Sequence, residues 1–191
     1  MDIEVLKAHI KPLMKSERYK HCIGVAELGG RLAEIYGADG KKAVIAGILH
    51  DCAKEFDNEK MHLYLNRSGA DRLVLKTPKL WHGPAGAVYA KDKFNIDDEI
   101  YDAIYYHTIG KEEMSLLTKI IFLADCIEVN RDSEFDWAGD MRILAEKNLD
   151  AAVLKVVEKN LISLIERGYS IHTNSVLCRN RLISADKKER V

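Results

Sequence analysis

Apolar residues recur at helical spacing along most of this 191-residue chain. Between Tyr19 and Tyr36 they follow steps of four, three, four and three residues, which places them on one face of a helix. That face comprises His21, Val25, Leu28, Leu32 and Ile35. Gly37 follows as a suitable stop, because glycine readily adopts the left-handed conformation that often ends a helix. His21 is therefore expected at the end of a buried face.

Similar stripes predict further helices over 41–54, 97–107, 115–129 and 141–167, with a shorter helix over 59–67. Residues 72–80 lack this periodicity and are expected to be irregular. The segment His82-Gly83-Pro84 is typical of a helix start with proline at the first helical position. The charged end, about 182–191, is expected to be frayed. Together these patterns predict an all-α bundle, with a single domain over 1–191 and a core at about 19–167.

The composition is that of an ordinary soluble protein, with 47% hydrophobic and 31% charged residues. The net charge is −1, so no basic excess indicates nucleic-acid binding. The longest apolar runs, such as 43–49, are too short to span a bilayer, and the acidic N-terminus lacks a secretory core. We therefore expect a cytoplasmic protein that binds neither membrane nor nucleic acid.

Candidate metal ligands are spread along the chain as His21, the doublet His50-Asp51, His82, His107 and Asp125. They are separated by 28, 30, 24 and 17 residues, so no short loop holds them, whereas several helices can project them into a shared cavity. Buried aspartates are rare unless paired or metal-bound, and both aspartates are flanked by apolar residues. Four imidazoles and two carboxylates fit two divalent metals with one bridging carboxylate. This ligand set suits iron, manganese, cobalt or zinc.

Three of the four cysteines directly follow candidate ligands: Cys22, Cys52 and Cys126. No pair has the C-x-x-C spacing of a structural zinc site. We interpret them as small apolar side chains that fill space between helices, because free cysteine commonly packs in this way. The alternative is that they support the ligands or respond to oxidation.

The order His, His-Asp, His, His, Asp resembles that of the HD-domain metal phosphohydrolases. Five local sequences narrow the resemblance to the bacterial YqeK-type family of symmetrical bis(5′-nucleosyl)-tetraphosphatases. They are HCIGV at 21–25, LHDCAK at 49–54, HGPAG at 82–86, YHTIG at 106–110 and SLLTKIIFLADCIE at 115–128. The resemblance runs from about residue 19 to about residue 182. The five segments in order are far more specific than the His-Asp pair alone.

The resemblance implies an HD-domain helical bundle and a division of the ligands. One metal would be held by His21, His50, Asp51 and Asp125, and the second by His82 and His107, with Asp51 as the catalytic bridge. Members of the family usually carry iron and act on the small molecule diadenosine tetraphosphate. The expected reaction is attack by a hydroxide that bridges the metals, which cuts the tetraphosphate in the middle and yields two ADP.

Cationic and small residues near the ligands are candidates for phosphate contacts. Lys54 is the first choice, because on a helix it lies one turn beyond the doublet, and we assign it to catalysis together with Asp51. The substrate-binding candidates are Arg18, Lys54, Thr108, Gly110 and Arg131. Thr108 and Gly110 would present a hydroxyl and a backbone N–H.

Several residues near the ligands admit two interpretations. The aromatic residues that flank the ligands either stack on adenine or pack in the core: Trp81, Tyr105 and Tyr106. Glu128 either orients a ligand or ends a helix. Three positions depart from the family pattern, which favours an acidic residue, tyrosine and proline where this chain has Thr118, Cys126 and Val129. The departures leave every ligand in place but put the wall of the substrate pocket in question.

Other functions remain open at this point. A different HD-domain phosphohydrolase would act on a nucleoside phosphate or a guanosine alarmone, and a di-iron oxygenase would use a related site. A metal-bound regulatory module needs no complete ligand set, yet all six residues are present here. The partner that we expect is a small dinucleoside polyphosphate. A homodimer is a further expectation, since helical bundles often leave apolar faces exposed.

Overall fold

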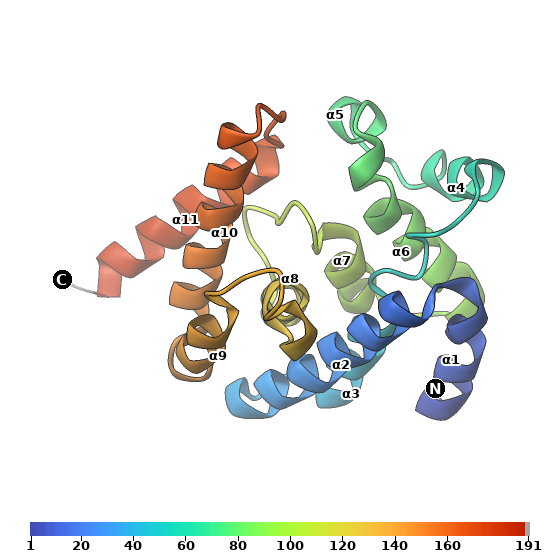
Figure 1. Ribbon diagram of the computed structural model, residues 1–191, viewed down its shortest axis with the longest axis horizontal. Helices are drawn as coiled ribbons and strands as arrows, with labels where there is room; N and C mark the ends of the chain where they lie inside the picture. The colour runs from blue at the N-terminus through green and yellow to red at the C-terminus, as the bar shows by residue number, and fades with distance from the viewer. Residues whose placement is uncertain (190–191) are drawn as a thin grey trace.

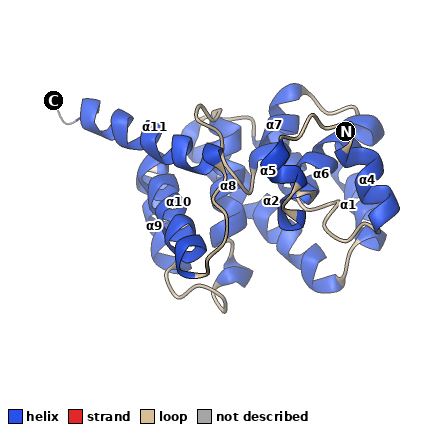
Figure 2. Cartoon of the chain, turned by 90° about the horizontal axis from the view of Figure 1, so that it is seen from above, coloured by secondary structure: helices blue, strands red, loops and turns tan. Residues whose placement is uncertain are grey.

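The computed structural model describes residues 1–189, and every regular element in that range is helical (Figures 1 and 2). This confirms the predicted all-α class. The α-helices are α1 (Ile3–Ile10), α2 (Ser16–Tyr36), α3 (Gly40–Leu49), α4 (Asn58–Leu65), α5 (Arg72–Leu75), α6 (His82–Phe94), α7 (Asp98–Tyr106), α8 (Leu116–Ile127), α9 (Ala138–Lys147), α10 (Leu149–Glu166) and α11 (Thr173–Glu189). Short 3-10 helices are η1 (Lys11–Leu13), η2 (Pro78–Leu80) and η3 (Val129–Arg131).

Helices α2 and α3 form a closely packed pair because glycine stands at their contact. A Cβ atom on Gly47 would lie 2.6 Å from the Cα atom of Ala26, so no larger residue fits without moving a helix. Gly37 ends α2 in the left-handed conformation, as predicted, with φ of 72°. Asp39 then begins α3, because its side chain accepts a hydrogen bond from the N–H of Lys42. The short connection holds two ligand-bearing segments side by side.

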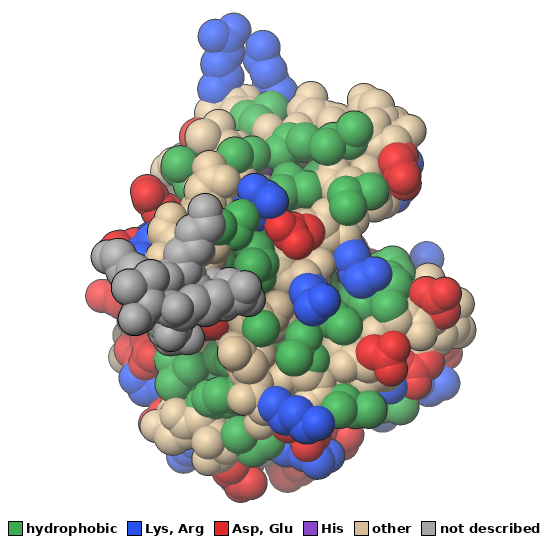
Figure 3. Space-filling model, turned by 90° about the vertical axis from the view of Figure 1, so that its left-hand side faces the viewer, with side chains coloured by type: hydrophobic (Ala, Val, Ile, Leu, Met, Phe, Trp, Pro, Cys, Tyr) green, Lys and Arg blue, Asp and Glu red, His purple; other side chains and the backbone are tan. Residues whose placement is uncertain are grey.

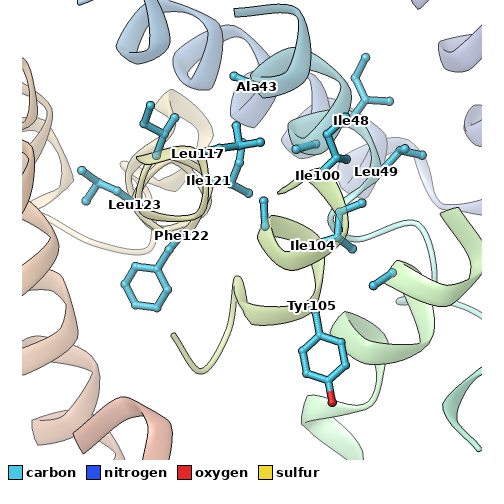
Figure 4. Packing of buried hydrophobic residues seen from close by; sticks show 14 of the residues in the cluster. Ala43, Ile48, Leu49, Ile100, Ile104, Tyr105, Leu117, Ile121, Phe122 and Leu123 are labelled. Carbon is cyan, nitrogen blue, oxygen red and sulfur yellow. The ribbon is translucent and has the colours of Figure 1, made fainter. Parts of the chain in front are cut away.

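The core is centred on α8, the most apolar helix of the chain. Its large side chains point outward in several directions and are fully buried between α3, α7 and α10 (Figure 4). They include Leu117, Ile120, Ile121 and Leu123. Ile48 and Ile104 pack against them from α3 and α7. Because the core fixes these helices, it also fixes the helix ends from which the ligand candidates project.

Several element boundaries differ from those predicted. The helix expected over 41–54 ends at Leu49, and the chain continues in tight turns in which the N–H of Lys54 donates to Asp51 O at 2.9 Å. The helix expected over 141–167 is divided into α9 and α10, because Asn148 is extended and its side chain caps α10 at Ala151 N. The residues expected to be irregular, 72–80, contain α5 and η2, since Asp71 caps the first and Pro78 opens the second.

The start of α6 and the C-terminal segment also differ from expectation. Helix α6 begins at His82, so Pro84 is its third residue rather than its first. Helix α11 continues to Glu189 through most of the segment expected to be frayed, while residues 190–191 lie outside the described residues. Within the described part of the chain, no helix has both the length and the hydrophobicity needed to cross a membrane.

We predict that Gly47→Ala destabilises the fold, because its methyl group must push α2 away from α3. Overpacking of this kind costs about 1–3 kcal/mol. Urea unfolding monitored by circular dichroism measures the change in the free energy of unfolding. Gly40→Ala is the matched control on the same helix, since a Cβ atom there meets nothing within 4 Å. Equal stability of the two variants would contradict the proposed role of Gly47.

Candidate metal centre

Five helices bring the six ligand candidates to one place. His21 lies in the second turn of α2, and His50 and Asp51 follow directly at the end of α3. His82 opens α6, His107 ends α7, and Asp125 lies in the last turn of α8. Five of them are buried and Asp125 is partly exposed. We call these six residues the metal cluster.

The imidazole nitrogens converge in two pairs. His21 Nε2 lies 3.2 Å from His50 Nε2, and His82 Nε2 lies 3.1 Å from His107 Nε2. Asp51 stands between the pairs: its Oδ2 lies 3.6 Å from His50 Nε2, while its Oδ1 lies 3.3 Å from His82 Nε2. The two oxygens of one carboxylate therefore face different pairs of histidines.

Asp125 completes the cluster on the His21 side. Its Oδ1 lies 2.9 Å from His21 Nε2 and 3.6 Å from His50 Nε2. Ligand atoms within 4.8 Å of one another form three overlapping groups, each large enough to hold a metal ion: His21, His50 and Asp51; His50, His107 and Asp125; Asp51, His82 and His107. Each group combines two imidazoles with one carboxylate and shares a member with another group.

Hydrogen bonds to the far side of three rings orient their Nε2 atoms toward the cluster. His50 Nδ1 lies 2.8 Å from Gly47 O, and His107 Nδ1 lies 2.7 Å from Ile104 O. Because a carbonyl only accepts, we assign the ring proton to Nδ1, which leaves the Nε2 lone pair free to bind a metal. In the same way His21 Nδ1 lies 2.9 Å from Glu128 Oε1.

The hydrogen bonding of Asp51 also indicates that these residues fit a divalent metal. Asp51 Oδ1 is buried and has no hydrogen-bond partner among the described residues. A buried carboxylate oxygen without a partner is costly, and a cation between Asp51, His82 and His107 would satisfy it. The donors are imidazole nitrogen and carboxylate oxygen throughout, which suits iron, manganese, cobalt or zinc.

Burial and charge shift the protonation equilibria of the ligands. Burial alone would lower the pKa of His21, but its hydrogen bonds to neighbouring carboxylates raise that pKa instead. Burial lowers the pKa of His50 from its ordinary value, and it lowers that of His82 much further, so both rings are neutral at pH 7. Burial alone would raise the pKa of Asp51 and Asp125. The neighbouring basic side chains, histidines and Lys54 among them, overcome this and hold both pKa values well below the usual range. Both carboxylates are therefore ionised.

Three of the predicted phosphate contacts lie at the cluster. Arg18 donates to Asp51 Oδ2 at 2.7 Å, and Arg131 donates to Asp125 Oδ1 at 3.0 Å. Lys54 Nζ lies 2.9 Å from His82 Nε2, although Lys54 reaches it from the turns after α3 rather than from a helix. The cationic side chains therefore surround the two carboxylates, where substrate phosphates would approach.

The other two candidates lie further out. The N–H of Gly110 donates to Tyr106 O at 2.8 Å, and Gly110 packs against Cys178, so the structure does not support its role as a phosphate donor. The Thr108 hydroxyl is buried and has no hydrogen-bond partner in the described part of the chain, and Thr108 lines a neighbouring pocket rather than the cluster. Glycine is needed at position 110 for another reason, a φ of 69°.

Glu128 both ends α8 and holds a ligand, two roles between which the sequence could not decide. Its side chain is 1% exposed, and its Oε2 accepts from Asn130 N at 2.8 Å while Oε1 faces His21. The carboxylate lies against α2 at Gly24, where a Cβ atom would collide with Oε2. Gly24, three residues after His21, is the sequence signal for this close approach.

The three cysteines beside the ligands turn their sulfur atoms toward other parts of the protein. Cys22 Sγ lies 3.9 Å from Met14 Sδ, Cys52 Sγ lies 3.8 Å from Gly86 O, and Cys126 Sγ lies 3.8 Å from Asn160 Nδ2. Burial raises the pKa of all three thiols. Their placement agrees with the interpretation as packing residues.

The departures from the family pattern lie outside the cluster. Thr118 is buried in the first turn of α8, where its hydroxyl lies 3.0 Å from Ser115 Oγ. Val129 is exposed on η3. Of the histidines that fit no metal pattern, His9 lies 3.0 Å from the Tyr89 hydroxyl, and His172 lies 2.7 Å from Asp71. Neither takes part in the cluster.

Comparison with known proteins accounts for this arrangement. The family model of the HD domain matches residues 18–130, which include all six members of the cluster. The chain belongs to the HD-domain family. Within this family it is 37% identical over 186 residues to the symmetrical bis(5′-nucleosyl)-tetraphosphatase of Bacillus subtilis, covering 96% of this chain and 99% of the relative. The enzyme of that name from Halalkalibacterium halodurans is 37% identical over 180 residues, with 93% and 95% covered.

A solved HD-domain structure shares the whole architecture. The crystal structure of a predicted HD superfamily hydrolase involved in NAD metabolism, from Clostridium acetobutylicum, superposes with a TM-score of 0.89 at 36% identity. The match covers 97% of this chain and 98% of that one. The HD-domain helical bundle and the family of symmetrical bis(5′-nucleosyl)-tetraphosphatases, both expected from the sequence, are thus confirmed.

We predict that Glu128→Ala weakens metal binding without removing a ligand, because His21 loses the acceptor that orients its ring. Loss of such a supporting hydrogen bond typically costs about 10–100-fold in metal affinity. Titration calorimetry of the metal-stripped protein with Mn²⁺ measures the metal affinity. Glu17→Ala removes an exposed carboxylate from the same side of the molecule and serves as the control. Equal affinities in the two variants would rule out the orienting role.

Proposed function

We propose that this HD-domain protein hydrolyses diadenosine tetraphosphate symmetrically to two ADP. The observation that carries the proposal is the Asp51 carboxylate, whose two oxygens face two different histidine pairs and lie within reach of the cationic side chains of Arg18 and Lys54. Relatives that this chain matches over nearly their full length bear the name of this activity. A dinuclear centre of this shape is suited to phosphoric anhydride hydrolysis.

In this proposal, one set of residues holds the metals and another set holds the phosphates. The metal cluster would hold two divalent cations, for which we propose iron, with manganese, cobalt and zinc as alternatives. Bound there, the cations would lower the pKa of water and offset charge on the phosphate oxygens. His50 and His107 fix the ligand geometry through Gly47 O and Ile104 O.

Arg18, Lys54 and Arg131 are the groups that we propose to bind the tetraphosphate. All three lie within 4.0 Å of a carboxylate of the cluster, so they stand beside the place where the middle phosphates must lie. Their positive charge stabilises the developing negative charge on the departing ADP. Lys54 is the one nearest to His82, which makes it the strongest candidate to stabilise the departing ADP.

The product pattern distinguishes the candidate functions. We expect metal-loaded protein to convert diadenosine tetraphosphate to ADP alone, as resolved by ion-exchange chromatography. AMP with ATP as products, or no turnover with iron or manganese, would contradict the proposal. Preferential turnover of a nucleoside phosphate or a guanosine alarmone would favour another HD-domain phosphohydrolase, and an oxygen-dependent product would favour an oxygenase.

Substitution of Asp51 provides a second test. We expect Asp51→Ala to lose metal and turnover together, because one carboxylate serves both histidine pairs. Metal content is measured by plasma emission spectroscopy and turnover by ADP release. Asp92→Ala is the control, since it removes an aspartate that pairs with Arg67 at the surface. Full metal content in Asp51→Ala would refute the bridging assignment.

A further inference from the structure

A pocket of about 420 Å³ is lined by residues that lie close in sequence to two members of the metal cluster. One wall is formed by residues 76–80 and 108–109, and the opposite wall by residues between Leu164 and Ser175 at the α10–α11 connection. Within the first wall, residues 76–80 lie just before His82, and residues 108–109 directly follow His107. The segments that carry one histidine pair therefore also line the pocket, so an elongated substrate whose phosphates lie at the cluster can reach it.

The pocket offers a flat, largely apolar surface. Its lining includes Leu80, Ile109 and Leu164, together with Tyr169, which is 44% exposed. Lys79 Nζ lies 4.4 Å and Arg167 Cζ lies 4.8 Å from the centroid of the Tyr169 ring, so a nucleobase that stacks on this ring takes the place of one of these cationic side chains. An exposed aromatic ring beside aliphatic side chains is the surface on which a nucleobase stacks.

Most polar groups in the pocket are already engaged within the protein, and the buried Thr108 hydroxyl is an exception among the described residues. The Ser175 hydroxyl donates to Ile109 O at 2.8 Å, and the Thr77 hydroxyl donates to Leu73 O at 2.8 Å. His172 lies 2.7 Å from Asp71. The pocket thus provides contact area rather than a set of free charges, which favours a base over a phosphate. Lysines at its rim, Lys76 and Lys79, are placed to meet the phosphates that follow the base.

The cavity on the His21 side has a different character. It measures about 230 Å³ and is lined by charged and polar residues, among them Arg18, Arg131 and Glu134. Its lining side chains within residues 1–189 are charged or polar, and the only ring among them is the imidazole of His21, whose nitrogens are engaged in the metal cluster. This side therefore suits phosphate groups, and it provides no surface on which a second base would stack.

We propose that the enzyme recognises one nucleoside of its symmetrical substrate, in the pocket that carries Tyr169, and holds the other half by its phosphates alone. The proposal rests on the proposed function and adds to it the site that determines specificity. On the face formed by α9, α10 and α11, hydrophobic side chains lie among Lys, Arg, Asp and Glu, and the outline is indented at one edge (Figure 3).

A substrate with a single nucleoside tests this directly. In adenosine 5′-tetraphosphate, the oxygen of water bonds to a middle phosphorus while the central bridging P–O bond breaks, which gives ADP and pyrophosphate. We expect its kcat/KM to lie within about threefold of that for diadenosine tetraphosphate, because the second base contributes little. A loss of more than 30-fold would show that both nucleosides are recognised and would overturn the proposal.

Substitutions in the pocket test its location. Tyr169→Ala is expected to raise KM about 10-fold for both substrates with kcat unchanged within twofold, because stacking is lost far from the reacting bond. Tyr169→Phe keeps the ring and recovers most of that affinity. Ser170→Trp, at an exposed position of the same wall, raises KM by filling the pocket. Ile165→Ala, an exposed residue outside the pocket, is the matched control and leaves KM unchanged.

The outcomes separate this inference from the function on which it rests. If wild-type protein cleaves diadenosine tetraphosphate to ADP but Tyr169→Ala and Ser170→Trp keep the wild-type KM, the pocket is not the nucleoside site and the proposed function stands. If metal-loaded wild-type protein does not cleave diadenosine tetraphosphate, the proposed function fails and this inference fails with it.

Discussion

The buried charge of Asp51 is the constraint around which the molecule is organised. An ionised carboxylate loses the stabilisation of water when it is buried, at a cost of several kcal/mol unless other groups replace it. Asp51 is 2% exposed, and its Oδ2 is paired with Arg18 while its Oδ1 has no hydrogen-bond partner among the described residues. Imidazoles from four helices crowd around this group. Arg18 and Lys54 compensate part of that charge, and a cation held by the surrounding imidazoles would compensate more of it.

The ends of two helices orient histidine rings toward the metal cluster. The last carbonyl groups of a helix have no partner within it, and His50 and His107 each follow a helix and donate Nδ1–H to the carbonyl three residues earlier. One local arrangement thus satisfies a carbonyl, fixes the ring proton and directs Nε2 inward, and the chain uses it twice. Gly83 helps at the start of α6, where a Cβ atom would come within 2.9 Å of Tyr105 O.

The sequence predicted the centre better than its surroundings. The six members of the cluster could be found because histidine and aspartate on apolar faces are rare and their spacing matches a family. Boundaries were less predictable: the turns after Leu49 and the break at Asn148 arise from caps and tertiary packing, which periodicity does not record. The supporting role of Glu128 needed the position of α8 against Gly24, and Tyr169 needed the meeting of α10 and α11 with residues far away in sequence.

The orientation of the cysteines has a consequence for metal selectivity. Cys22, Cys52 and Cys126 are each one peptide bond from a ligand, yet their sulfur atoms face Met14, Gly86 and Asn160. A soft ion such as cadmium or monovalent copper therefore meets no thiolate at this centre, although three thiols lie adjacent to it in the chain. The direction in which successive side chains leave the backbone therefore gives this centre nitrogen and oxygen donors, while the neighbouring sulfur atoms face other parts of the protein.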